Sequence, residues 1–186
     1  MAAKSTLRNM VLCLTAVCLL CGAILGIVYA VTYQPIAEAA HKALVASIAQ
    51  VLPDGGEISD AQTSGDFEYY SSITEDGVLG YAVKSSTVGF GGTLTLMVGV
   101  LPDGTVYNTS VLSHSETPGL GAKCTTDEEF KKQWEGFAPD KVLKVKKDGG
   151  DVDAITASTI TSRAYTLAVS NAVEFVKSIN GGLENE

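Results

Sequence analysis

Histidine is scarce in this chain of 186 residues, which holds only two, His41 and His114. The sequence shows no Ser-His-Asp arrangement of the kind used in nucleophilic catalysis. It also shows no group of His, Cys, Asp and Glu at metal-ligand spacing. We therefore expect neither a metal site nor a set of catalytic side chains belonging to this chain.

The four cysteines are distributed so that no disulfide can crosslink the part of the chain after the apolar segment. Three of the four cysteines, Cys13, Cys18 and Cys21, lie in one apolar segment, where a free thiol behaves as a small apolar side chain. Cys124 stands alone in the rest of the chain, so no internal disulfide can form there. The stability of that part must come from packing.

Basic residues are outnumbered, because 13 Lys and Arg face 21 Asp and Glu and give a formal net charge of −8. Nucleic-acid-binding proteins need basic patches, so the balance argues against a nucleic-acid partner. A local run of lysines is the one exception, and it is typical of a solvated strand face or, as the alternative, of a contact for a partner subunit: Lys141, Lys144, Lys146 and Lys147.

One long apolar run is present. Residues 10–32 carry no charge and are numerous enough to cross a hydrocarbon core of about 30 Å as a transmembrane helix. Lys4 and Arg8 precede the run, which favours residues 1–9 in the cytoplasm and the remaining chain on the outer, periplasmic face of the cytoplasmic (inner) membrane. A cleaved signal peptide is the alternative, since residues 37–40 read Ala-Glu-Ala-Ala, but the run is longer than the usual signal-peptide core.

A stalk helix is predicted next, over residues 33–52. Pro35 is expected to break or kink the membrane helix, because proline removes a backbone hydrogen bond. Apolar residues at spacings of three and four then mark one helical face, and they are Ile36, Ala40, Ala43, Leu44, Ile48 and Val51. Residues 53–66 are rich in Gly, Asp and Ser and predict a loop.

An antiparallel meander follows. Strand-like runs cover residues 67–73, 78–83, 93–100 and 106–112, and turn residues separate them at 76–77, 85–92 and 102–104. A helix is expected from Thr126 with Glu129 completing a capping box, and another strand over 142–145. The predicted fold class is α+β: one N-terminal transmembrane helix and one domain, residues 53–186, with an antiparallel sheet and flanking helices.

Hydroxyl side chains crowd the start of the last helix. They are Thr156, Ser158, Thr159, Thr161 and Ser162. The helix itself is marked by a repeating apolar face, formed by Tyr165, Val169, Ala172, Val176 and Ile179, and is expected to stop at Asn180-Gly181-Gly182. Free N–H groups and the positive end of the helix dipole make this end a natural phosphate site. Simple capping by one or two hydroxyls is the alternative.

Two segments resemble a known family. Residues 156–162, Thr-Ala-Ser-Thr-Ile-Thr-Ser, resemble the S-G-A-T-x-T flavinylation motif, and residues 114–121 resemble its H-x-E-T-P-G-L-G segment. Both belong to the FMN-binding domain shared by the G subunit of the Rnf complex and the C subunit of the sodium-translocating NADH:quinone oxidoreductase. The stretches 89–92, 96–100 and 130–136 also resemble that family, so the similarity covers most of the chain.

The resemblance implies a covalent flavin. In that family the last Thr of the motif, here Thr161, carries FMN through a phosphoester bond made by a flavin transferase. The other hydroxyls of the motif would surround the phosphate, and the second segment would contact the flavin through Glu116, Thr117, Gly119, Leu120 and Gly121. Glu116 is expected to accept a hydrogen bond from the ring or the ribityl chain. Ala157-Ser158 departs from the usual Gly-Ala, and glycine allows backbone angles that alanine resists.

The function implied by the resemblance is that of an electron-carrier subunit. Such a subunit works with other membrane and peripheral subunits that couple electron flow between ferredoxin and NAD to Na⁺ or H⁺ translocation. The chain length is closer to the G subunit of the Rnf complex than to the C subunit of the quinone reductase. The alternatives are that C-type subunit, or a membrane-anchored assembly or binding module without flavin.

Overall fold

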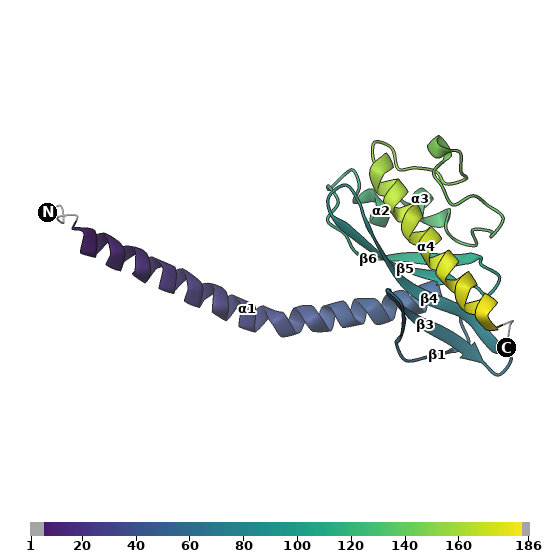
Figure 1. The fold of residues 1–186 in the computed structure, drawn as a ribbon, viewed down its shortest axis with the longest axis horizontal. Helices are drawn as coiled ribbons and strands as arrows, with labels where there is room; N and C mark the ends of the chain where they lie inside the picture. Colours follow the sequence, from purple (N-terminus) through teal and green to yellow (C-terminus); the bar gives the residue numbers. More distant parts are fainter. Residues whose placement is uncertain (1–5, 184–186) are drawn as a thin grey trace. The chain divides into compact units, whose positions relative to one another are not determined.

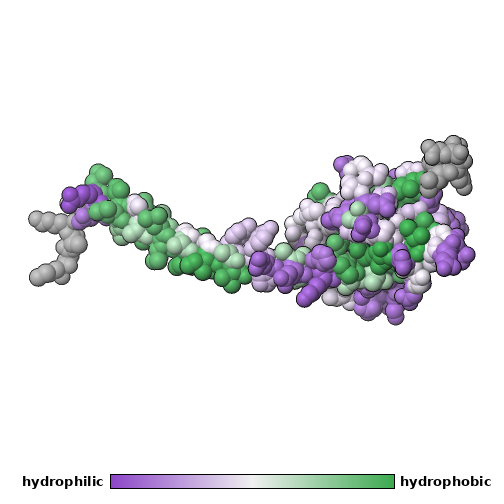
Figure 2. Space-filling view, turned by 90° about the horizontal axis from the view of Figure 1, so that it is seen from below, coloured by the Kyte–Doolittle hydropathy of each residue, from purple (hydrophilic) through white to green (hydrophobic). Residues whose placement is uncertain are grey.

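The structure is a computed structural model that describes residues 6–183. The chain divides into two compact units between Ala43 and Leu44. The first unit consists of the greater part of helix α1 (Leu7–Val51), which displays its apolar side chains on the surface (Figure 2). By length and composition this helix can cross a membrane, in agreement with the span predicted for residues 10–32.

Helix α1 runs through Pro35 without interruption, where the sequence predicted a second helix. A proline removes one backbone hydrogen bond, but the turns on either side keep theirs. The predicted apolar face is buried only toward the end of the helix. Ile36, Ala40 and Ala43 are exposed, whereas Ile48 and Val51, which belong to the second unit, are buried.

The second unit is built on a six-stranded antiparallel sheet in the order β1-β3-β4-β5-β6, with β2 also pairing with β3 (Figure 1). The strands are β1 (Glu57–Ile58), β2 (Gln62–Ser64), β3 (Phe67–Thr74), β4 (Gly77–Val88), β5 (Thr93–Val100) and β6 (Val106–Ser113). The predicted meander is confirmed. Two details differ: the expected loop at 53–66 contains β1 and β2, and β4 continues to Val88.

Both faces of this sheet are covered. Because side chains alternate along a strand, Ala82 and Met97 face the end of α1 and pack with Ile48 and Val51. The neighbouring side chains on the same strands point to the opposite face and form the main core with helix α4 (Thr159–Leu183) (Figure 1). The start of α4 is thereby fixed relative to the ends of β4 and β6.

The apolar face predicted for α4 is confirmed. Tyr165, Val169, Ala172 and Val176 are buried, and Ile179 packs against the same core. The predicted stop at Asn180-Gly181-Gly182 was wrong, because α4 continues through this segment to Leu183. The Asn180 side chain instead bonds to the rest of the domain: its Oδ1 accepts from the Tyr81 hydroxyl at 2.9 Å, and its Nδ2 donates to the Pro102 carbonyl at 3.1 Å.

Short helices connect β6 to α4: α2 (Lys123–Thr126), α3 (Glu128–Lys132) and the 3-10 turn η1 (Lys146–Asp148). The predicted capping box from Thr126 was wrong by one residue. Asp127 caps α3, and its Oδ1 accepts from the N–H groups of Glu129 and Phe130. Trp134, four residues after Phe130, is completely buried and belongs to the main core.

The strand predicted over residues 142–145 is absent from the described chain. Only Val145 forms an isolated bridge, with Val152, and the Val142 N–H donates to the Asp151 side chain at 2.7 Å. The backbone of residues 151–152 also pairs with this segment, since the Asp151 N–H donates to the Val142 carbonyl at 3.1 Å and the Val152 N–H to the Lys144 carbonyl at 3.0 Å, but this pairing is too short to form a strand. The lysines of this segment do not share a strand face, and Lys146 instead pairs with Asp153 at 2.7 Å.

The cap of α3 can be tested by mutation. We expect Asp127→Ala to lower the free energy of unfolding by about 1 kcal/mol, because two helix N–H groups lose their acceptor. Thr126→Ala, the matched control, should change it by less than about 0.5 kcal/mol. Urea denaturation of the full chain in detergent, followed by circular dichroism, measures both. Equal losses in the two variants would contradict the assignment of the cap.

Candidate functional site

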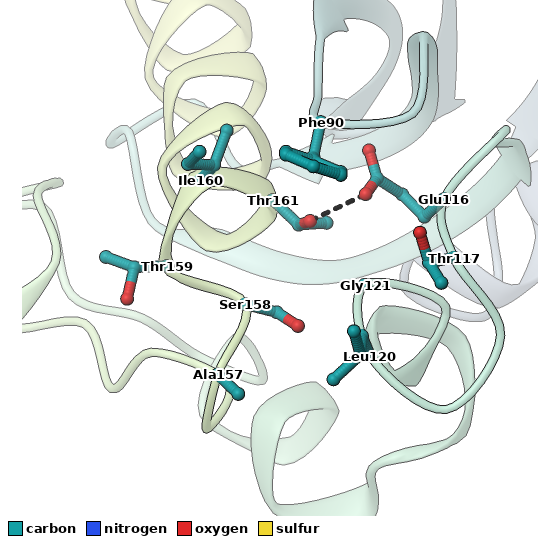
Figure 3. Close-up of a pocket in the computed structure, with 10 residues that line it drawn as sticks. All are labelled: Phe90, Glu116, Thr117, Leu120, Gly121, Ala157, Ser158, Thr159, Ile160 and Thr161. Carbon is teal, nitrogen blue, oxygen red and sulfur yellow. Dashed lines mark hydrogen bonds between the residues drawn. The ribbon is translucent and has the colours of Figure 1, made fainter.

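A cavity of about 340 Å³ lies where the start of α4 meets the β4–β5 turn and the loop after β6 (Figure 3). Its volume falls within the roughly 300–1,000 Å³ of small-molecule pockets. The residues that line it are Phe90, Glu116, Thr117, Leu120, Gly121, Ala157, Ser158, Thr159, Ile160 and Thr161. The structure thus brings together the two segments that the sequence singled out.

A hydrogen bond in the wall of the cavity joins these two segments. The Thr161 hydroxyl donates to Glu116 Oε2 at 2.7 Å, across 45 residues of sequence (Figure 3). Both side chains are buried, with exposed fractions of 1% for Thr161 and 6% for Glu116. The sequence placed both residues at the site but did not predict this contact.

The carboxylate of Glu116 is held in place from several sides. Its Oε1 accepts from the Gly91 N–H at 3.3 Å, and the Glu116 N–H donates to His114 Nδ1 at 3.2 Å. Glycine clears the space around the carboxylate, because a Cβ at Gly89 or Gly121 would collide with it. This need for space explains why the two glycine-containing loops lie beside the same acid.

The predicted hydroxyls take three different roles. Ser162 is a buried structural residue: its Oγ accepts from the Ile155 N–H at 2.9 Å and donates to the Ser158 carbonyl at 3.0 Å. Thr156 is exposed and does not line the cavity. Thr159 lines it, but its side chain points away from Glu116 (Figure 3). Gly119, in the opposite loop, also lies outside the lining.

The side-chain hydroxyl of Ser158 is available to bond a ligand. Its Oγ is buried and has no hydrogen-bond partner among the described residues, although it lines the cavity. The first backbone N–H groups of an α-helix likewise lack partners within the helix, and α4 begins at Thr159. A phosphate at this end of the cavity would satisfy both kinds of donor. The residues present therefore fit the phosphate of FMN.

The mouth of the cavity is apolar. Phe90, Leu120 and Ile160 line it while remaining 69%, 45% and 52% exposed. A planar aromatic group packed against them would remove this apolar surface from water. Phe90 and Ile160 were not predicted as site residues; the signal for Phe90 was its place in the Gly-Phe-Gly-Gly stretch, and nothing marked Ile160.

Ala157 has a left-handed backbone with φ of 63°, the one positive φ among the described residues other than glycine. The turn before Ser158 requires this conformation, which costs a residue with a Cβ roughly 1–2 kcal/mol. The sequence departure at this position therefore does not prevent the turn from forming. It leaves the turn strained.

Replacing Ala157 by glycine should relieve the strain. We expect Ala157→Gly to raise the free energy of unfolding by about 1 kcal/mol, a gain reduced by the greater freedom of glycine in the unfolded chain. Ala154→Gly, three residues earlier and without a positive φ, should lower it. Thermal unfolding of the two variants beside the parent measures the difference. A loss of stability in Ala157→Gly would contradict the strain.

Cys124 is buried near the site but is not a reactive group. Burial raises the pKa of its thiol to about 11, and the nearby Glu116 charge acts in the same direction. The thiol is therefore protonated at neutral pH and is a poor nucleophile.

Comparison with known proteins assigns the chain to a family. The sequence profile of the FMN-binding domain matches residues 89–174, which include the whole cavity lining. The chain is 34% identical to the G subunit of the proton-translocating ferredoxin:NAD(+) oxidoreductase complex of Clostridium ljungdahlii, over 91% of both chains. It is 35% identical to the G subunit of the ion-translocating oxidoreductase complex of Shewanella amazonensis, over 93% of this chain and 89% of the relative.

The chain therefore belongs to the family of G subunits of ion-translocating oxidoreductase complexes, and it carries an FMN-binding domain. Among solved structures, the crystal structure of Shewanella oneidensis NqrC is similar with a TM-score of 0.49 and 19% identity, covering 68% of this chain and 70% of that chain.

Proposed function

We propose that this protein is a membrane-anchored electron carrier whose FMN is attached through a phosphoester bond to the Thr161 hydroxyl. The observation that carries the proposal is the position of that hydroxyl. It lies inside the cavity, at the start of α4, near the Ser158 Oγ, which has no hydrogen-bond partner in the part of the chain that the structure describes. A phosphate bonded to Thr161 would lie among these donors.

The charges around the cavity favour a covalent link. No Lys or Arg is among the residues that line it, and Glu116 contributes a carboxylate. A dissociable FMN phosphate would therefore meet no cationic side chain there, only the neutral Ser158 hydroxyl and the helix N-terminus, whose dipole is worth about 0.3–2 kcal/mol. Micromolar affinity requires about 8 kcal/mol, most of which the apolar contacts at the mouth would have to provide. A phosphoester bond makes retention of the flavin independent of its concentration.

The chain's own residues would then position the flavin. Phe90, Leu120 and Ile160 provide apolar contacts for the ring, and Ser158 and the first N–H groups of α4 hold the phosphate. Thr117, Leu120 and Gly121 line the opposite wall of the cavity and would contact the flavin there. FMN itself supplies the redox chemistry.

We infer the cellular location and the partner subunits of this chain from those of its relatives. Helix α1 would anchor the chain in the cytoplasmic membrane with residues 1–9 inside and the flavin domain on the outer face. The relatives are named as subunits of complexes that translocate ions, one of them with ferredoxin and NAD(+) as substrates. We assign this chain to electron transfer within such a complex, with other subunits as partners and a flavin transferase for maturation.

Intact mass spectrometry tests the attachment. The full chain, co-produced with a flavin transferase, should gain the mass of FMN less one water. Thr161→Val should gain nothing, because its side chain has no hydroxyl to esterify. Thr159→Val is the matched control and should load like the parent, since its side chain points away from Glu116.

Two results would contradict the proposal. A parent without added mass, in cells where the transferase modifies a known substrate, would leave an assembly module without flavin. An adduct that persists in Thr161→Val would keep the carrier but move the bond to another hydroxyl. Flavin fluorescence of the protein band in a denaturing gel gives an independent reading of the covalent link.

A further inference from the structure

Glu116 combines three properties that binding a flavin does not require. It is a buried carboxylate, it forms no ion pair with any residue that the structure describes, and it accepts its shortest hydrogen bond from the hydroxyl that is to be esterified. Burying an acid without a cation is costly, so its presence at this position calls for an explanation.

The surroundings of Glu116 direct one oxygen at Thr161. Its Oε1 is occupied by the Gly91 N–H, which leaves Oε2 for the Thr161 hydroxyl. His114 fixes the backbone of Glu116, and Gly121 leaves room between the two side chains, because a Cβ there would lie 2.6 Å from the Thr161 Oγ1. The pair is thus already in the geometry of a nucleophile and its base, within about 2.6–3.2 Å.

An alcohol is a weak nucleophile until a base takes its proton. We propose that Glu116 is the general base for the attachment of FMN: it accepts the Thr161 proton while the Thr161 oxygen attacks phosphorus. This inference rests on the proposed function and adds a chemical role within the acceptor chain itself. A transferase would then supply the flavin donor and stabilise the leaving group without having to deprotonate Thr161.

The step balances with a flavin adenine dinucleotide as donor. The bond between Thr161 Oγ1 and the phosphorus on the FMN side forms, and the bridging P–O bond of the pyrophosphate breaks. AMP leaves with the electron pair of that bond, and the proton moves from Thr161 Oγ1 to Glu116 Oε2. No electrons are exchanged with another molecule.

The product state also favours a protonated Glu116. The new phosphoester carries a negative charge next to the site of the carboxylate, and two like charges in a buried site repel each other. A neutral carboxylic acid avoids this repulsion and gains a hydrogen-bond donor toward the phosphoester oxygens. One side chain therefore serves as an acceptor before the reaction and as a donor after it.

Glu116→Gln tests the role directly, because glutamine keeps the size and the acceptor oxygen but cannot take the proton. With full chain in detergent, purified transferase and flavin adenine dinucleotide, we expect loading, followed by intact mass, to slow by about 10²–10⁴-fold. The fall should be in kcat, with the KM for the dinucleotide unchanged. Glu116→Asp, which retains a base at a longer distance, should load at an intermediate rate.

Two controls separate chemistry from folding. Glu68→Gln alters another carboxylate that accepts a hydroxyl hydrogen bond, from Tyr70, outside the cavity, and should load at the parent rate. Added formate should accelerate loading of Glu116→Ala, because it can enter the space left by the side chain and act as the base. It should not accelerate loading of Glu116→Gln, where that space is filled.

The experiment distinguishes failure of the general-base role from failure of the proposed function. A Glu116→Gln variant that loads within threefold of the parent overturns the inference and leaves the proposed function intact. A slow Glu116→Gln variant with raised KM, unchanged kcat and no formate rescue of Glu116→Ala also overturns it, since the residue then acts only in binding. A parent that never loads overturns the proposed function and this inference with it.

Discussion

The hydrogen bond between Thr161 and Glu116 is the contact on which the rest of the site depends. It joins the start of α4 to the loop after β6, and it exists only because α4 lies across the sheet at a fixed position. Tyr165, one turn after Thr161, is buried in the core and shares a hydrogen bond of 2.8 Å with Thr109 on β6. Thr87 on β4 donates to the Ala164 carbonyl at 2.9 Å. Packing and these two bonds together set the register of the helix.

The same arrangement divides the cavity into regions of different chemistry. Hydrogen-bond donors gather at the start of α4, the Glu116 carboxylate accepts from the Thr161 hydroxyl, and apolar side chains surround the mouth. Glycines at positions 89, 91 and 121 leave room for the buried acid and its loop, because a Cβ at any of them would collide with Glu116 or with the neighbouring Ser115. Under the proposed attachment at Thr161, the phosphate would lie among the donors and the ring would pack against the apolar mouth.

The sheet and the buried face of the last helix could be predicted from the sequence. Alternating runs and turn residues predicted the meander, and the apolar spacing of Tyr165, Val169 and Ala172 predicted the buried face of α4. Predictions from local sequence patterns were wrong where contacts with distant parts of the chain determine the secondary structure. Residues 151–152 pair with the segment around Val142 too briefly to form the predicted strand. Helix α4 continues through the predicted stop at Asn180-Gly181-Gly182, while the Asn180 side chain bonds to Tyr81. The pairing of Thr161 with Glu116 could not be predicted, because it joins residues far apart in sequence.

Site mapping of the flavin tests the proposed attachment at the level of a single residue. Trypsin should release residues 148–163 of the loaded protein as one peptide, which contains all five hydroxyls of the motif. Fragmentation of that peptide by electron transfer, which preserves phosphoesters, locates the added mass. We expect FMN on Thr161 alone. FMN on Ser158 or Thr159, or flavin that leaves the denatured protein without cleavage of a bond, would refute the attachment to Thr161.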